Sequence, residues 1–182
     1  VGGGEESFGY MVGDFVRDKD AVTSTLLACE IAAQAKANGS SFYKDLIQCY
    51  VDYGFYKEHL VSLTKKGISG AEEIKQMLLD FKNNPVESVA GSKVKWIEDY
   101  NTSIATNVIS GEERAMDLPK SNVLIYETED GTRVAARPSG TEPKVKFYIS
   151  TNTTLDKAEN FKQVSAELDA KIARILSELN LG

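Results

Sequence analysis

The chain has 182 residues, of which 42% are hydrophobic and 26% charged, and its formal net charge is -6 at pH 7. These proportions are ordinary for a soluble globular protein, and the length suffices for one sizeable core or two small ones. The acidic balance disfavours non-specific binding to nucleic acid or to an anionic membrane, and no apolar run approaches the roughly 20 residues that cross a bilayer.

A glycine-rich loop is predicted over residues 2–9, and a charged cluster, Arg-Asp-Lys-Asp, follows at residues 17–20. The chain starts without a methionine, and its first residues lack the basic and apolar regions of a signal peptide. We interpret this start as the cut end of a longer protein, and we expect a cytoplasmic location.

Two helices are predicted next. Over residues 20–37, apolar side chains recur at helical spacing, an aspartate can cap the start, and a glycine lies where the helix would stop. Residues 41–53 carry a second apolar stripe at the same spacing, and Gly54 follows. Because Cys29 and Cys49 fall on these helices without a C-x-x-C spacing, we expect reduced, partly buried thiols.

A strand over residues 55–64 and a third helix come after Gly54. Ser69 and Glu72 have the spacing of a capping box, which predicts that this helix begins at Ser69. Pro85 and the two asparagines before it predict its end. The expected apolar face of the helix consists of Ile74, Met77, Leu78 and Phe81.

The rest of the chain is predicted to form strands closed by one long helix. Two strands, 123–128 and 133–136, should form a hairpin joined by Glu-Asp-Gly, and residues 144–150 alternate between apolar and polar side chains. A short alternating segment precedes residues 105–120, and residues 105–120 themselves are expected to be irregular. The last helix is predicted over residues 153–180, where apolar residues recur at helical spacing.

An antiparallel sheet covered by helices on one side would bury all of these apolar faces, so the sequence predicts an α+β fold. The weakest link along the chain lies near Gly54. Before it come a loop and two helices, whereas a complete set of strands and helices follows it. We therefore predict two domains, residues 1–54 and residues 55–182.

The segment with the clearest chemistry joins two predicted strands at residues 137–143, Arg-Pro-Ser-Gly-Thr-Glu-Pro. Arg137 offers a planar fork that can bond two phosphate oxygens, and the hydroxyls of Ser139 and Thr141 add donors. Gly140 lets successive backbone N–H groups converge on an anion. The same residues are also common in exposed turns, so chemistry alone leaves a phosphate site and an ordinary turn equally open.

Positive charge gathers just after this segment. Lys144 and Lys146 follow it, so that together with Arg137 three cations stand against the single carboxylate of Glu142. This local excess contrasts with the acidic chain as a whole, and Lys146 is a possible substrate contact.

The seven-residue string and the alternating strand after it resemble the phosphate-binding loop of the α-D-phosphohexomutase family, which contains phosphoglucomutases and phosphomannomutases. The resemblance implies that this segment forms a phosphate clamp, which holds the phosphate group that is not being transferred. The implied clamp residues are Arg137, Ser139, Gly140 and Thr141.

Two N-terminal motifs resemble the same family. Residues 4–9, Gly-Glu-Glu-Ser-Phe-Gly, resemble its sugar-recognition loop, which implies that Glu5 and Ser7 contact sugar hydroxyls. The Arg-Asp-Lys-Asp cluster resembles a string that follows this loop in glucose-type and bisaccharide-phosphate-type members, which implies that Lys19 reaches the substrate to steer phosphate or to assist proton transfer. Alternatively, the cluster is a solvated helix start that aspartates cap.

The resemblance extends over essentially the whole chain. It implies that residues 1–54 are the end of the third α/β domain of a phosphohexomutase, and that residues 55–182 are its fourth domain, an antiparallel sheet with helices of the TATA-binding-protein-like class. That fold class does not imply DNA binding. The implied enzyme interconverts hexose 1-phosphate and 6-phosphate through a phosphoserine and a bisphosphate intermediate.

Two parts of that enzyme have no counterpart in this sequence. In the family, a serine of the N-terminal domain carries the phosphoryl group, and a D-G-D-x-D-R loop of the second domain holds Mg²⁺. Neither pattern occurs here, so we expect no catalytic or metal-binding residue in this chain, and no turnover by the chain alone. Its expected partners are a hexose phosphate and the missing N-terminal domains, not nucleic acid or membrane.

Two other interpretations stay open. A stand-alone sugar-phosphate-binding module would carry both loops without catalysis, although the abrupt start of the chain favours a piece of an enzyme. A nucleic-acid-binding domain would need a basic face with interleaved aromatic residues, and only the small cluster near Arg137 is basic. The sequence does not decide between glucose, mannose and pentose phosphates, but the pairing of the two N-terminal motifs favours glucose.

Overall fold

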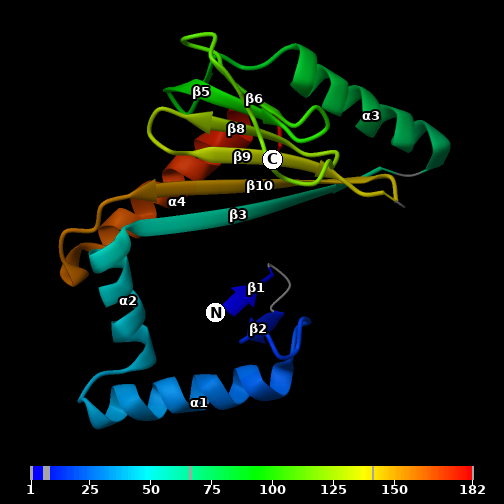
Figure 1. Cartoon of the computed structure of the whole chain (residues 1–182). Coiled ribbons are helices and arrows are strands. Elements are labelled where there is room, and N and C mark those ends of the chain that lie inside the picture. The colour runs from blue at the N-terminus through cyan, green and yellow to red at the C-terminus, as the bar shows by residue number, and fades with distance from the viewer. Residues whose placement is uncertain (1, 6–8, 66, 141, 182) are drawn as a thin grey trace. The chain divides into compact units, whose positions relative to one another are not determined.

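The chain divides into two units, Val1–Tyr53 and Gly54–Gly182. The computed structural model describes residues 2–5, 9–65, 67–140 and 142–181 (Figure 1). Within these residues no helix is long and apolar enough to cross a membrane.

The first unit consists of a two-stranded ribbon and two helices. Its strands β1 (Gly2–Gly4) and β2 (Tyr10–Val12) pair antiparallel, so part of the segment predicted as a loop is a short strand. The helices are α1 (Ala21–Ala37) and α2 (Phe42–Tyr53), which confirms both helix predictions to within a residue. Asp20 caps α1, because its carboxylate accepts the Val22 N–H at 2.9 Å.

The apolar stripes of these helices are largely exposed. Val22 is 79% and Leu26 62% exposed, and Ala35 is the buried residue of α1. Cys29 and Cys49 are both exposed, so the expectation of partly buried thiols is wrong. The physical reason is that the short ribbon offers too little apolar surface to cover two helices of 17 and 12 residues.

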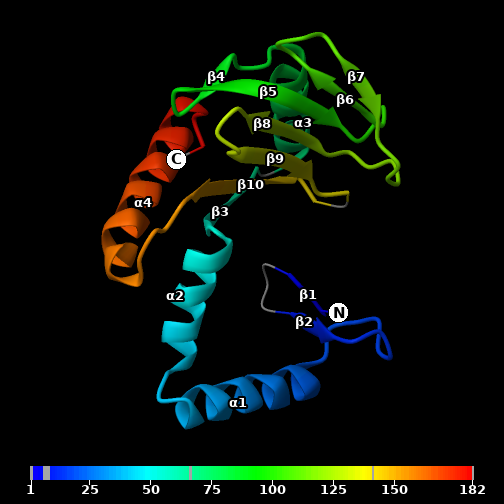
Figure 2. The ribbon, with the colours of Figure 1, turned by 60° about the vertical axis from the view of Figure 1, so that its left-hand side comes forward.

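An antiparallel sheet forms the second unit, with strand order β3-β10-β9-β8-β5-β6-β7 and the two-residue β4 paired with β5 (Figures 1 and 2). All of its pairs are antiparallel, as predicted. The strands are β3 (Phe55–Thr64), β4 (Ser88–Val89), β5 (Ser92–Asp99), β6 (Ile104–Asn107), β7 (Glu113–Ala115), β8 (Leu124–Thr128), β9 (Arg133–Pro138) and β10 (Lys144–Thr153).

Two helices, α3 (Gly67–Asn83) and α4 (Phe161–Glu178), cover one face of this sheet, and a single 3-10 turn, η1 (Ala158–Asn160), precedes α4. The ring of Phe81 on α3 lies edge-on to that of Phe147 on β10, with 5.7 Å between ring centroids. Ile175 on α4 joins the same core and is fully buried. The predicted α+β class is confirmed, with helices burying the apolar side of an antiparallel sheet.

Three predicted boundaries are wrong, each because tertiary contacts override the local pattern. The third helix begins at Gly67, which places Ser69 inside its first turn instead of at its cap. Residues 105–120 are not wholly irregular, because β6 and β7 extend the sheet edge there. The last helix begins eight residues later than predicted, since β10 continues pairing with β3 as far as Thr153.

The β8–β9 hairpin is tied to α4 by the carboxylate of Asp130. One of its oxygens accepts the hydroxyls of Thr128 at 2.7 Å and Thr132 at 2.8 Å, and the other accepts Lys171 Nζ at 2.8 Å. Burial raises the pKa of Asp130, but these hydrogen bonds outweigh it and hold that pKa well below its usual value.

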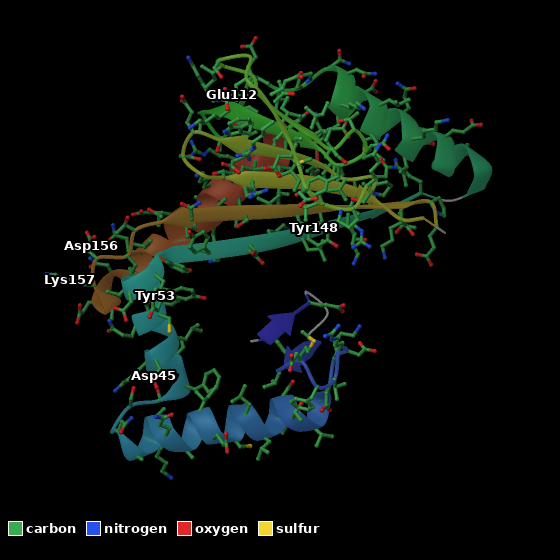
Figure 3. All side chains as sticks on the ribbon, in the orientation of Figure 1. Asp45, Tyr53, Glu112, Tyr148, Asp156 and Lys157 are labelled. Carbon is green, nitrogen blue, oxygen red and sulfur yellow. The ribbon has the colours of Figure 1, made fainter. Side chains whose placement is uncertain are left out.

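Replacing Asp130 with asparagine should therefore lower the free energy of unfolding by about 1 kcal/mol near pH 7. Since the folded-state pKa is depressed, this stabilisation is complete above the unfolded pKa of about 3.9, declines below it, and is lost only as the pH falls through the folded-state pKa. Urea titrations from pH 7 to pH 3 should show the difference between the two proteins starting to shrink at the acid end of this range. As a control, Asp156→Asn removes an exposed carboxylate (labelled in Figure 3) and should leave the profile unchanged; an equal effect would contradict the prediction.

Candidate functional site

Alternation along β10 places its lysines on the side of the sheet away from the helices. Val145 and Phe147 are 0% and 1% exposed in the core, so Lys144 and Lys146 leave the strand on the opposite face. The register pairs Lys146 with Arg137 on β9. Directly opposed residues of an antiparallel pair share a face, so the sheet itself brings these two cations together.

Backbone hydrogen bonds fix the loop between β9 and β10. Ser139 N–H donates to the Lys144 carbonyl at 2.8 Å, and Lys144 N–H donates to the Glu142 carbonyl at 2.8 Å. Glu142 N–H also donates to the Ser139 hydroxyl oxygen at 3.2 Å. The loop is thus closed on itself at the point where two prolines already restrict the chain.

The loop is also held from outside by the end of β3. Lys65 N–H donates to the Pro143 carbonyl at 2.9 Å. The first turn of α3 packs tightly on Lys65, because a Cβ atom at Gly70 would lie 2.6 Å from Lys65 Cβ. Only a residue without a side chain allows this approach, so Gly70 helps to set the position of Lys65 and, through it, of the loop.

A pocket of about 310 Å³ opens beside the loop. Arg137 is exposed and forms no salt bridge or side-chain hydrogen bond with the residues that the structure describes, and the same holds for Lys144. Arg137 and Lys144 thus present to the pocket two cationic groups that no carboxylate of the described chain neutralises. Its lining consists of Arg137, Pro138, Ser139, Gly140, Glu142, Lys144 and Lys146.

Four residues singled out from the sequence thus meet in one pocket: Arg137, Ser139, Gly140 and Lys146. Thr141, the remaining member of the predicted clamp, lies outside the described residues. Lys144 also lines the pocket although it was not singled out as a contact. The signal that identifies it is the two-residue period of the strand, which puts Lys144 on the same face as Lys146.

Of the predicted sugar loop, the structure describes Gly4, Glu5 and Gly9, which belong to or adjoin the paired strands β1 and β2. Glu5 N–H donates to the Gly9 carbonyl at 2.9 Å. The Glu5 side chain is 49% exposed, as expected for a carboxylate that meets a ligand or solvent. Ser7, the second predicted sugar contact, lies outside the described residues.

Lys19 lies against this loop. Its Nζ is 3.3 Å from Glu5 Oε1 and 3.4 Å from Asp18 Oδ1. The lysine side chain crosses directly over Gly9, where an added Cβ would lie 2.7 Å from Lys19 Cγ, so a larger residue would displace it. Tertiary structure therefore joins the two sequence motifs through Glu5 and Lys19, which lie 14 residues apart.

Hydrogen bonds to the Glu5 and Asp18 carboxylates raise the pKa of Lys19. Its ammonium consequently stays protonated at neutral pH, which suits the attraction of an anionic substrate better than the abstraction of a proton. The helix-start interpretation of this cluster applies to Asp20, which caps α1. Hydrogen bonds from the Thr23 hydroxyl and the Val22 N–H lower the pKa of Asp20. Capping of α1 in this cluster thus belongs to Asp20, and the contact of Lys19 with a substrate stays a prediction.

No group of three or more His, Cys, Asp or Glu side chains among the described residues could hold a metal ion. The two candidate loops belong to different units, and each is defined here by its own contacts.

Two protein-family models match the chain. The model described as "Phosphoglucomutase/phosphomannomutase, alpha/beta/alpha domain III" matches residues 1–50, and the one described as "Phosphoglucomutase/phosphomannomutase, C-terminal domain" matches residues 82–171. The two matches follow each other in domain order, and the second contains the whole of the pocket.

Curated relatives with significant similarity include phosphoglucomutases of Staphylococcus aureus. The protein of strain MSSA476 is 38% identical over 168 residues, and that of strain N315 is 36% identical over the same length. Each alignment covers 92% of this chain but 29% of the relative, so the chain spans less than a third of the relatives' length.

A solved structure is also similar, the open form of the phosphoglucomutase pp63/parafusin from Paramecium. It is 17% identical with a TM-score of 0.49, and the match covers 94% of this chain and 30% of that one.

Proposed function

Because this chain belongs to the phosphoglucomutase/phosphomannomutase family, we propose that it forms the substrate-binding portion of a phosphohexomutase, an isomerase that interconverts hexose 1-phosphate and 6-phosphate. The observation that carries the proposal is the pocket beside the β9–β10 loop, where Arg137 and Lys144 lack carboxylate partners within the described chain. Such a pocket attracts a dianion such as a sugar phosphate.

In this proposal the phosphate group that is not being transferred lies in the pocket. Arg137 donates two parallel hydrogen bonds, and Ser139 and Gly140 add a hydroxyl and a backbone N–H. Thr141 would contribute a second hydroxyl, and Lys146 a third positive charge from the adjacent strand. These groups recognise phosphate and little of the sugar, so the pocket can hold a phosphate at either end of a bisphosphate intermediate.

The sugar would be held by the first unit. Glu5 can accept hydrogen bonds from two vicinal hydroxyls, and Ser7 would donate or accept one more. Lys19 remains protonated beside Glu5 and would attract the phosphate end of the substrate. The substrate is a glucose, mannose or related sugar phosphate, and the presence of both motifs favours glucose.

The phosphoryl-transfer chemistry would come from other parts of the enzyme. We propose that residues 1–54 complete a third domain and residues 55–182 form the fourth, that the enzyme is cytoplasmic, and that a phosphoserine and Mg²⁺ belong to the preceding domains. Mg²⁺ would neutralise charge on the transferring group. Positioning the substrate is then the contribution of this chain, and the chain alone should not turn it over.

The proposal is tested by titrating the ¹⁵N-labelled chain with glucose 1-phosphate and recording amide chemical shifts. The amides of Ser139 and Gly140 should move with saturation, whereas equal concentrations of glucose should leave them in place. Inorganic phosphate should produce the same loop shifts without those near Glu5. Absence of any loop shift at millimolar sugar phosphate would contradict the proposed clamp.

Replacing Gly140 with alanine should separate binding from folding. An added Cβ meets no atom within 4 Å, and the residue is not among the glycines with positive φ, so the fold should change in stability by less than about 0.5 kcal/mol. The methyl group would instead hold the anion away from the backbone N–H, weakening phosphate binding by roughly fivefold. Calorimetric titration with phosphate measures the affinity, and thermal unfolding measures the stability. Unchanged affinity would mean that the Gly140 backbone N–H does not bind the phosphate.

A further inference from the structure

Tyr148 lies two residues after Lys146 on β10 and therefore shares its face of the sheet (Tyr148 is labelled in Figure 3). The Lys146 Nζ is positioned over the Tyr148 ring, 6.0 Å from its centroid. Both side chains are half-buried. An ammonium at this distance from an aromatic face is attracted by the negative charge density of the ring.

The ring is held by a rigid part of the sheet. Tyr148 pairs with Ala135 on β9 and with Leu60 on β3, so apolar residues flank it on both neighbouring strands. On the opposite face, Phe147 and Ile149 are each 1% exposed in the core, which fixes the backbone from which the tyrosine extends. The ring thus extends from a strand that packing holds in place, which suits it to orient the Lys146 ammonium.

A lysine gains more from a preorganising contact than an arginine does. A lysine has a flexible four-carbon stem and a compact charge, whereas the planar guanidinium of arginine loses less freedom for each hydrogen bond formed. Lys146 and Arg137 face each other across β9 and β10 and line the same pocket. Restricting the ammonium of Lys146 before a ligand arrives would reduce the entropy lost on binding.

We propose that Tyr148 is a positioning residue of the phosphate pocket, whose ring holds the Lys146 ammonium beside Arg137 and so increases the affinity for a phosphate dianion. The inference rests on the proposed function and extends it, since it assigns a role to an aromatic residue that does not itself line the pocket. It also makes Lys146 a working phosphate ligand.

A double-mutant cycle tests this role. The dissociation constant for inorganic phosphate is measured for the 182-residue chain and for the Tyr148→Leu, Lys146→Met and doubly substituted chains. Tyr148→Leu should weaken binding about two- to fivefold when Lys146 is present, the range expected for a weak cation–π contact, and should have no further effect in the Lys146→Met chain. Tyr148→Phe keeps the ring and should bind as the unsubstituted chain does.

A second readout follows the geometry directly. The Lys146 side-chain protons should experience the ring current of Tyr148, and their NMR signals should move downfield in Tyr148→Leu but hardly in Tyr148→Phe. If Tyr148→Leu lowers the affinity equally with and without Lys146, or does not lower it at all, the positioning role is wrong. Arg137→Ala tests the pocket independently of that role. If the unsubstituted chain fails to bind phosphate, or Arg137→Ala leaves binding intact, the proposed function fails instead.

Discussion

Replacing Arg137 with alanine is expected to weaken phosphate binding by about tenfold to a hundredfold, the largest functional effect of any single substitution in this chain. Hydrogen bonds to charged groups contribute about 1.5–3 kcal/mol, and a tenfold change in affinity corresponds to about 1.4 kcal/mol. Arg137 can make two such bonds in parallel, and no carboxylate among the described residues competes for it. Calorimetric titration with phosphate and with glucose 1-phosphate measures the loss.

Two further variants make this result specific. Arg137→Lys keeps the charge but loses the planar fork, so its affinity should fall between those of the unsubstituted and alanine proteins. Arg174→Ala removes an exposed arginine of α4, which likewise has no ion pair in the described part of the chain, and should leave phosphate binding unchanged. Equal losses in Arg137→Ala and Arg174→Ala would indicate general attraction by positive charge, and the β9–β10 pocket would not be the site.

The largest expected effect on stability is that of Phe147→Ala, which should lower the free energy of unfolding of the second unit by about 3–5 kcal/mol. Phe147 is 1% exposed and lies in the core where β10 meets both helices. Its ring also contacts that of Phe81 on α3. Truncation would leave a cavity that this closely packed interior cannot fill without moving a helix.

Urea unfolding followed by tryptophan fluorescence measures this effect. The sequence contains one tryptophan, Trp96, and it lies on β5 of the second unit, so the signal does not mix the two units. Tyr56→Ala provides a control, because Tyr56 is an aromatic residue of β3 that is 56% exposed and should cost about 1 kcal/mol or less. A similar loss in both variants would mean that Phe147 is not central to the core.

The sequence predicts the structure most accurately where a pattern of residues is local and complete. The alternation of β10 places Val145 and Phe147 in the core as predicted, and the Asp-Gly turn joins β8 to β9 as expected. The apolar face of α3 packs against the sheet, with Ile74 buried. These elements could be predicted because a strand or helix buried on one side must repeat apolar residues at its own period.

Prediction fails where the deciding partner is distant in the sequence. The β10 strand outlasts its alternating pattern because Thr153 pairs with Phe55, almost a hundred residues earlier. Similarly, the apolar stripe of α1 predicted a buried face, but the small ribbon beside it leaves Val22 exposed. Local spacing contains no information about how much surface another element will cover.

The same distinction between local pattern and distant pairing applies to the candidate site. By itself, the sequence determined which residues could bind phosphate, because Arg137, Ser139 and Gly140 lie within four positions of each other and carry the required donors. Only the tertiary structure determined which other side chains lie beside them in the pocket. The β9–β10 register sets Lys146 opposite Arg137, and Tyr148 lies beneath its ammonium. A short segment fixes the chemistry of its own side chains, whereas which charges from separate strands meet depends on a pairing register that the whole sheet determines.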